Sequence, residues 1–145
     1  MSAIRIEAIQ ALAEPKIFER GKSYYEEGMI INPIMRDNRI EAFSHGSQIY
    51  RVSAYISEGH IGQTHCSCPY DWGGVCKHIV ALLLTYLHQP KLFIKHPTIG
   101  ELLLNKNRQD LINIIETMLD RHPTLLELVD PNLDLPEELF WDDDY

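Results

Sequence analysis

The segment from Thr64 to Leu87 contains all three cysteines of this chain and is the feature that most limits how the chain can fold. It reads THCSCPYDWGGVCKHIVALLLTYL, with a Cys-x-Cys pair, a seven-residue gap and a Cys-x-His pair before a run of apolar residues. Three thiolates and one imidazole form a donor set that suits tetrahedral zinc. We therefore expect one zinc ion held by four metal ligands, Cys66, Cys68, Cys76 and His78.

The spacing of these residues predicts where each of them lies. Side chains two apart on a strand point to the same face, so Cys66 and Cys68 at a strand end would direct both sulfurs to one side. Residues two apart in a helix diverge by about 200°, so Cys76 and His78 cannot both lie within a helix and reach one ion. We expect Cys76 at or just before a helix start and His78 in its first turn. The positive end of the helix macrodipole would then favour the thiolates.

The expected site is structural, because four protein ligands leave no open position for water or a substrate. One alternative is a set of ordinary buried thiols beside a surface histidine. Another is a disulfide between Cys66 and Cys68, which the strain of so short a ring disfavours. His65 lies next to Cys66 and would point to the opposite face of the strand. We therefore leave His65 out of the ligand set.

At these residues the sequence resembles the SWIM zinc-finger family, whose signature is Cys-x-Cys, a variable gap and Cys-x-His on a strand-strand-helix core. The four donor residues match this signature one by one, and Lys77 with the apolar run Ile79 to Leu84 looks like the helix of the family. The segment FERGKSYYEEG, from Phe18 to Gly28, is similar to the one that precedes the finger in many bacterial members. The resemblance covers about residues 16–87. It implies binding to DNA or to other proteins, often beside a helicase or transposase, and no chemistry of its own.

The remaining patterns predict an α+β fold. Two helices, in the first dozen residues and at 16–27, precede an antiparallel β-meander of about four strands. Turn signals at Asp37-Asn38, 45–47 and Glu58-Gly59 separate these strands, and the last strand leads to Cys66. The finger is then a strand-strand-helix unit with its core at about residues 48–88.

The helix after His78 is apolar almost all round, so it must be covered on two sides. The sheet is one cover, and we expect helices nearer the C-terminus to be the other. A capping box, Thr98-x-x-Glu101, opens a short helix, and a longer one carries an apolar stripe of Leu111, Ile114, Ile115, Met118 and Leu119. An alternative is that a spare apolar face docks a partner. We expect a single domain over 1–129 and an acidic, flexible tail or linker over 130–145.

The net charge of −8 is confined to the C-terminal end. Residues 1–119 contain 12 Lys or Arg and 12 Asp or Glu, whereas residues 120–145 contain one Arg and nine acids. A balanced body argues against a strongly basic clamp for nucleic acid. The tail is interpreted as a solubilising segment, with a recognition motif or a mimic of nucleic-acid charge as alternatives.

The sequence favours a cytoplasmic protein. Its longest apolar run, Ile79 to Leu84, is six residues, against roughly 20 needed to span a bilayer. The N-terminus lacks the pattern of a signal peptide, and cysteines gathered in a metal pattern fit a reducing compartment.

Two functions remain open at this point, and neither involves a membrane or an evident small-molecule substrate. The first is a non-catalytic module in which zinc fixes a surface for another protein. The second is binding of DNA through the finger, with the acidic tail as a regulatory DNA mimic. The candidate contact residues are Tyr70, Trp72, Lys77 and Arg51, and Arg36 and Arg39 are further available cations. We predict no enzyme, because no Ser/His/Asp arrangement, phosphate-binding loop or His-Glu-x-x-His pattern is present. Cys76 and His78 could be drawn as a nucleophile and base, but their two-residue separation favours shared ligation.

Overall fold

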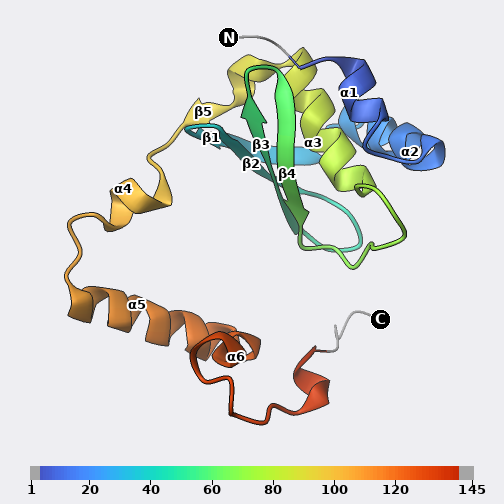
Figure 1. The fold of residues 1–145 in the computed structure, drawn as a ribbon. Coiled ribbons are helices and arrows are strands. Elements are labelled where there is room, and N and C mark those ends of the chain that lie inside the picture. Colours follow the sequence, from blue (N-terminus) through green and yellow to red (C-terminus); the bar gives the residue numbers. More distant parts are fainter. Residues whose placement is uncertain (1–3, 141–145) are drawn as a thin grey trace. The chain divides into compact units, whose positions relative to one another are not determined.

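The computed structural model describes residues 4–140 and divides into two compact units, 1–99 and 100–145 (Figure 1). The first unit contains α1 (Ile6–Gln10), α2 (Pro15–Glu26), β1 (Ile30–Arg36), β2 (Arg39–Ser44), β3 (Tyr50–Ser57), β4 (His60–Cys66), α3 (Lys77–His88) and β5 (Ile94–Lys95). The remaining helices are α4 (Ile99–Leu103), α5 (Arg108–Arg121) and α6 (Leu126–Val129), with short 3-10 turns at Pro90–Leu92, Pro123–Leu125 and Glu137–Phe140. The α+β class is confirmed, while a single domain over 1–129 stays a prediction.

The sheet has five strands in the order β4-β3-β2-β1-β5. Strands β1 to β4 form the expected antiparallel meander. The prediction of about four strands missed β5, which pairs in parallel with β1 by placing Ile94 beside Ile34. Because β5 is two residues long, it has no alternation that a sequence pattern could reveal.

The meander turns where the sequence offers residues that tolerate positive φ. Asp37 adopts φ 53° between β1 and β2, and Glu58 and Gly59 adopt φ 51° and 80° between β3 and β4. Positive φ at both central residues is the geometry of a tight hairpin turn that matches the twist of the strands. The turn at Glu58-Gly59, together with a register shift between Ala54 and Ile56, sets the register that places Cys66 opposite Val52 at the end of β4.

The core lies between one face of the sheet and α3. Along β3, Val52, Ala54 and Ile56 alternate inward, and every residue of α3 from His78 to Thr85 is buried. Figure 1 shows α1 and α2 on the side of α3 that faces away from the sheet, and both helices pack against it. The N-terminal helices therefore provide the second cover that the apolar character of α3 requires.

A glycine lets α2 approach α3 closely. A Cβ on Gly21 would overlap the side chain of Val80 and lie 2.9 Å from the carbonyl oxygen of Lys77. Gly21 is buried in α2, and the two atoms it faces lie in the first turn of α3. The contact therefore holds in place the part of α3 that carries His78.

The C-terminal unit differs from this arrangement. None of the described residues from 100 to 140 is buried, and the core cluster contains no residue beyond Phe93. The expectation that the C-terminal helices form a core layer over α3 stays a prediction. The helix α5 itself was predicted correctly, and none of its residues is buried within the second unit. Within the described part of the chain, no helix has the length and apolar content to cross a membrane.

Candidate metal centre

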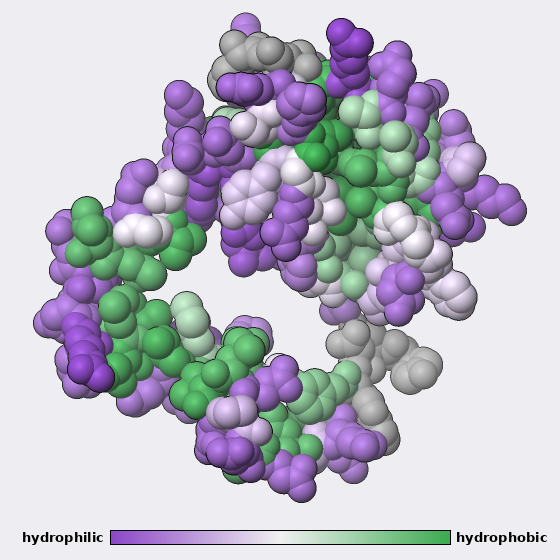
Figure 2. Space-filling model, viewed as in Figure 1, coloured by the Kyte–Doolittle hydropathy of each residue, from purple (hydrophilic) through white to green (hydrophobic). Residues whose placement is uncertain are grey.

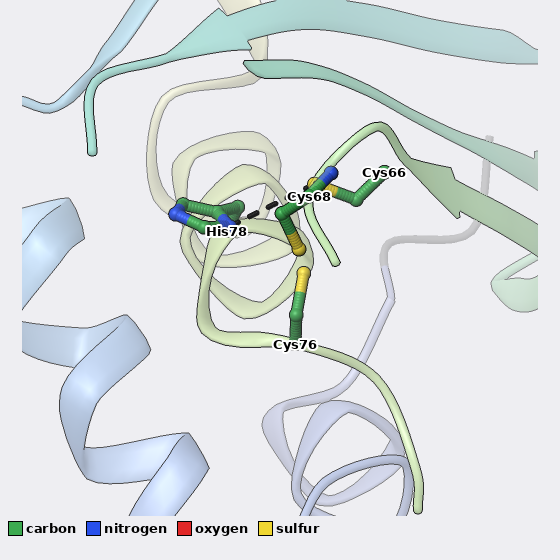
Figure 3. Close-up of side chains that lie close together, drawn as sticks. All are labelled: Cys66, Cys68, Cys76 and His78. Carbon is green, nitrogen blue, oxygen red and sulfur yellow. Dashed lines mark hydrogen bonds between the residues drawn. The ribbon is translucent and has the colours of Figure 1, made fainter. Parts of the chain in front are cut away.

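Two elements bring the four predicted ligands together. Cys66 is the last residue of β4 and Cys68 follows two positions later, while Cys76 is the N-cap of α3 and His78 lies in its first turn. Between the first two cysteines, Ser67 is fixed against β3, because its backbone N–H donates to the carbonyl of Arg51 at 3.0 Å and its hydroxyl accepts from the amide of Arg51 at 2.9 Å. Figure 3 shows the four side chains converging from these two segments.

The distances fit a zinc ion. The four donor atoms all lie within 4.8 Å of one another, and the Sγ of Cys66 is 3.7 Å from the Nδ1 of His78. Zinc–sulfur and zinc–nitrogen bonds of ordinary length place tetrahedral S···S pairs about 3.8 Å apart and S···N pairs about 3.6 Å apart. The donors therefore already have nearly the spacing that one ion would impose. The donor set and its burial suit one structural zinc ion.

The loop between the two ligand pairs reverses direction at two glycines. Gly73 and Gly74 adopt φ 108° and 68°, a region that other residues enter at a cost. A Cβ on Gly74 would lie 2.6 Å from the carbonyl oxygen of Leu12, and that same oxygen accepts a hydrogen bond from the amide of Val75 at 3.0 Å. The connection between α1 and α2 is therefore fastened to the loop just before Cys76.

The two aromatic residues of the loop have different environments. Tyr70 packs against the core and donates a hydrogen bond from its hydroxyl to the carbonyl of Gly73 at 3.0 Å. Trp72 is 81% exposed. Tyr70 thus closes the loop, and Trp72 projects into solvent.

The imidazole of His78 lies between two tyrosines from distant parts of the chain. Its ring centroid is 5.5 Å from that of Tyr24 on α2, edge on, and 4.7 Å from that of Tyr50 on β3. Its Nε2 is buried without a hydrogen-bond partner, and a Cβ on Gly46 would lie 3.0 Å from that atom. Packing of the two rings, together with the hydrogen bond between Nδ1 and the Sγ of Cys66, directs Nδ1 to the cysteines.

Without a metal, the cysteines share protons unequally. The pKa of Cys76 is lowered to about 4, chiefly because the Cys66 thiol donates a hydrogen bond to its sulfur, with the amide of Ile79 at the helix start also contributing. The pKa of Cys66 is raised, first by that same hydrogen bond and then by burial. Burial also raises the pKa of Cys68. The metal-free cluster therefore holds one thiolate and two thiols, and zinc must displace protons to bind.

The other candidate contact residues lie outside the cluster. The Nζ of Lys77 is 4.8 Å from the centre of the Tyr24 ring. Arg51 forms an ion pair with Glu41, NH2 to Oε1 at 2.7 Å, and keeps 54% of its side chain exposed. His65 pairs with Ser53 across the sheet and is absent from the cluster, as its position in the strand predicted.

Comparison with known proteins agrees with this geometry. Residues 50–87 match the family model of the SWIM zinc finger. The chain carries a SWIM zinc finger. A SWIM zinc finger is a binding module for protein or nucleic acid, and the matched range runs from the start of β3 through most of α3.

The chain is also similar to an uncharacterized protein of Methanocaldococcus jannaschii. The two are 26% identical over 109 residues, which is 75% of this chain but 45% of that protein. The chain therefore spans less than half the length of this relative. No solved structure matches the chain significantly.

Sequence reasoning missed three supports of the finger. The close contact at Gly21, the attachment of the loop to Leu12 and the two tyrosines around His78 all join positions that are far apart in sequence. Only the similarity of the segment Phe18 to Gly28 to the one preceding other SWIM fingers marked that region in advance. Both Gly21 and Tyr24 belong to it.

Proposed function

We propose that this protein is a non-catalytic interaction module in which a SWIM zinc finger stabilises the fold and a separate apolar surface binds another protein. Cys66, Cys68, Cys76 and His78 would be the zinc ligands. Four protein donors fill a tetrahedral shell, so a bound ion would have no position for water or substrate. The donors come from the end of β4 and the start of α3, so the ion would join sheet to helix rather than act on a substrate.

The observation that carries the protein-binding proposal is the exposed apolar stripe of α5. Ile115 and Met118 of this stripe are 44% and 51% exposed, and the neighbouring Ile112 is 38% exposed. An open groove of about 610 Å³ runs beside Ile114, Met118 and Leu125. Figure 2 shows apolar side chains, in green, gathered over α4 and α5. A helix with one apolar face and no core to bury it is the form in which helices bind the grooves of other proteins.

The charge of the second unit indicates which surface a partner protein would present. Residues 100–140 contain three Lys or Arg and nine Asp or Glu. An acidic unit that presents an apolar helix stripe is complementary to an apolar groove with basic residues at its rim. We therefore propose a partner protein with such a groove and a reducing, cytoplasmic setting in which free thiols and zinc persist.

Capture of partners from a cell extract tests this proposal. The zinc-loaded chain is immobilised at about 200 mM salt, where weak contacts with nucleic acid are screened. We expect a protein that the wild type retains and that Ile115→Lys with Met118→Lys loses. Glu116→Lys adds the same charge to an exposed position of α5 and should retain the partner. Equal capture by all three chains would contradict a role for the stripe.

A second candidate function is DNA binding through the finger. It is favoured by the exposed guanidinium of Arg51 on β3 and by Lys77 in the first turn of α3. Binding of this kind weakens steeply as salt rises, because cations released from the phosphates are replaced by protein charges. Retention of duplex DNA that falls with salt and is lost in Lys77→Ala with Arg51→Ala would favour this candidate over the first.

A further inference from the structure

The face of the sheet opposite α3 presents both aromatic and cationic side chains. Phe43 on β2 and Tyr55 on β3 are 41% and 44% exposed on this face, and half of the Arg51 side chain is exposed beside them. No described element of the first unit packs against this face, since α1, α2 and α3 all lie on the other side. Aromatic rings and cations on one uncovered face are the groups that stack on bases and contact phosphates.

The register of β2 and β3 places an arginine directly beside each ring. Phe43 pairs with Arg51, and Arg39 pairs with Tyr55. The guanidinium of Arg39 lies 5.7 Å from the centre of the Tyr55 ring. The two ring-arginine pairs are about 13 Å apart along the strands, since four residues separate them. The face therefore repeats one unit, an aromatic ring paired across the strands with an arginine.

A buried carboxylate fixes the arginines in this arrangement. Glu41 lies between the two pairs with 4% of its side chain exposed, and its oxygens lie 2.7 Å from Arg36, 2.7 Å from Arg51 and 3.5 Å from Arg39. Three guanidiniums and one carboxylate leave an excess of two positive charges on the face. Because arginine side chains are otherwise mobile, this network holds the charges ready for a ligand.

A shallow cavity of about 310 Å³ opens on this face. Its lining includes Phe43, Arg36, Arg51, Glu41 and Asn32. Ile34 and Ala42 complete the lining, so the cavity combines an aromatic and aliphatic part with hydrogen-bonding groups and charges. A planar group with polar edges would stack on the ring while its edge meets these groups.

We propose that this face of the sheet binds single-stranded nucleic acid. Bases would stack on Phe43 and Tyr55, and the neighbouring arginines would contact the phosphates. A single strand is favoured over a duplex because stacking on a side chain needs an unpaired, splayed base, whereas duplex grooves admit a helix or a ribbon. The proposal goes beyond binding of a protein by α5, and it needs neither that surface nor an exposed zinc ligand.

The near-neutral charge of the first unit permits binding of a single strand, with modest affinity. Residues 1–99 contain ten Lys or Arg and nine Asp or Glu, so the acidic excess lies outside the unit that carries the sheet. About three phosphate contacts give a slope of roughly −2 for log K against log salt with a single strand. The complex should therefore form at about 50 mM salt and weaken by about an order of magnitude at 200 mM.

Fluorescence anisotropy of labelled oligonucleotides tests the proposal on the zinc-loaded full chain. The probes are oligo-dT and oligo-U of about 12 nucleotides, the length that one small single-strand module covers, and a duplex of equal length. Phe43→Leu and Tyr55→Leu remove the ring but keep an apolar side chain, and each should weaken single-strand binding roughly 5- to 100-fold. Trp72→Leu removes a more exposed aromatic, at 81%, from the zinc loop and should leave the affinity unchanged.

Each other result overturns the proposal. Unchanged affinity in Phe43→Leu and Tyr55→Leu would exclude stacking on the sheet, and a loss confined to Trp72→Leu would move binding to the finger loop. Equal affinity for single strand and duplex, or no binding at about 50 mM salt, would also exclude it. Unaltered thermal unfolding of the variants shows that lost binding does not come from a lost fold.

Discussion

Helices α3 and α5 have similar lengths and each carries an apolar pattern, yet only α3 is buried. Eight residues of α3 are buried, whereas α5 buries none. The sheet covers α3 on one side and α1 and α2 cover it on the other, while α5 lies in a unit whose described residues form no core. Periodicity thus predicts that a helix forms and which face is apolar, but it does not identify what covers that face.

Removal of zinc should produce the largest difference in stability between the two units. Structural zinc contributes on the order of 10 kcal/mol in finger peptides, which is comparable to the whole stability of a small domain. Chelation, or Cys68→Ser, should therefore abolish cooperative unfolding of residues 1–99 and leave the helicity of α5 intact. Residue-resolved NMR before and after chelation measures both effects. His65→Ala, next to Cys66 on the other strand face, is the control and should unfold like the wild type.

Zinc affinity should depend on pH with a defined sign. The metal-free cluster holds Cys76 as a thiolate, because its pKa is lowered to about 4, and keeps Cys66 and Cys68 as thiols, because their pKa values are raised. Zinc binds thiolates, so each ion should release two protons near neutral pH, and affinity should fall about 100-fold for each unit of acidification. Calorimetry in buffers of different ionisation enthalpy counts the protons. A count near zero would mean that all three sulfurs are already ionised.

Crowding at Gly21 should have a smaller effect, again confined to the first unit. Gly21→Ala adds a methyl group that overlaps Val80 and forces α2 away from the start of α3. Overpacking of this kind costs about 1–3 kcal/mol. Denaturant unfolding measures the loss, and Ser23→Ala, at an exposed position of the same helix, should change stability by less than about 0.5 kcal/mol. Equal stability of the two variants would show that the interface between α2 and α3 accommodates the added methyl group at little cost in free energy.

The smallest effect is expected in the second unit. Asn107 and Asp110 form a capping box, in which the Oδ1 of Asn107 accepts from the amide of Asp110 at 2.8 Å and the Oδ2 of Asp110 accepts from the amide of Asn107 at 3.1 Å. Asn107→Ala should destabilise α5 by about 1 kcal/mol and fray its first turn. Chemical shifts of residues 108–111 report this, with Arg108→Ala as the control. A lowered melting temperature of the first unit would mean that the two units are not independent.

The ligand cluster was predictable because short sequence separations fix its geometry. A strand end that carries Cys66 and Cys68 and a helix start that carries Cys76 and His78 follow from periods of two and 3.6 residues. The N-cap position of Cys76 is confirmed, as are the two N-terminal helices and the meander. Each of these features depends on residues close together in the chain.

The parts that sequence reasoning missed depend on contacts over long separations. The capping box at Asn107 is an exception, since it was readable and overlooked. Strand β5 exists because Ile94 meets Ile34, and the ring of His78 is placed by Tyr24 and Tyr50. The two ring-arginine pairs, Phe43 with Arg51 and Tyr55 with Arg39, could be predicted only from the register of β2 and β3. Residue patterns alone do not fix that register to one position.

The hydrogen bond from Val75 to Leu12 makes the N-terminal segment part of the enclosure around the sulfurs. With Gly74 pressed against the same carbonyl, the loop cannot swing outward unless the connection between α1 and α2 gives way first. The rate of zinc release should then be limited by detachment of these residues rather than by breakage of a metal–sulfur bond. A variant that lacks the residues before Leu12 should lose its zinc to a competing chelator faster, even where the equilibrium affinity for zinc is little altered.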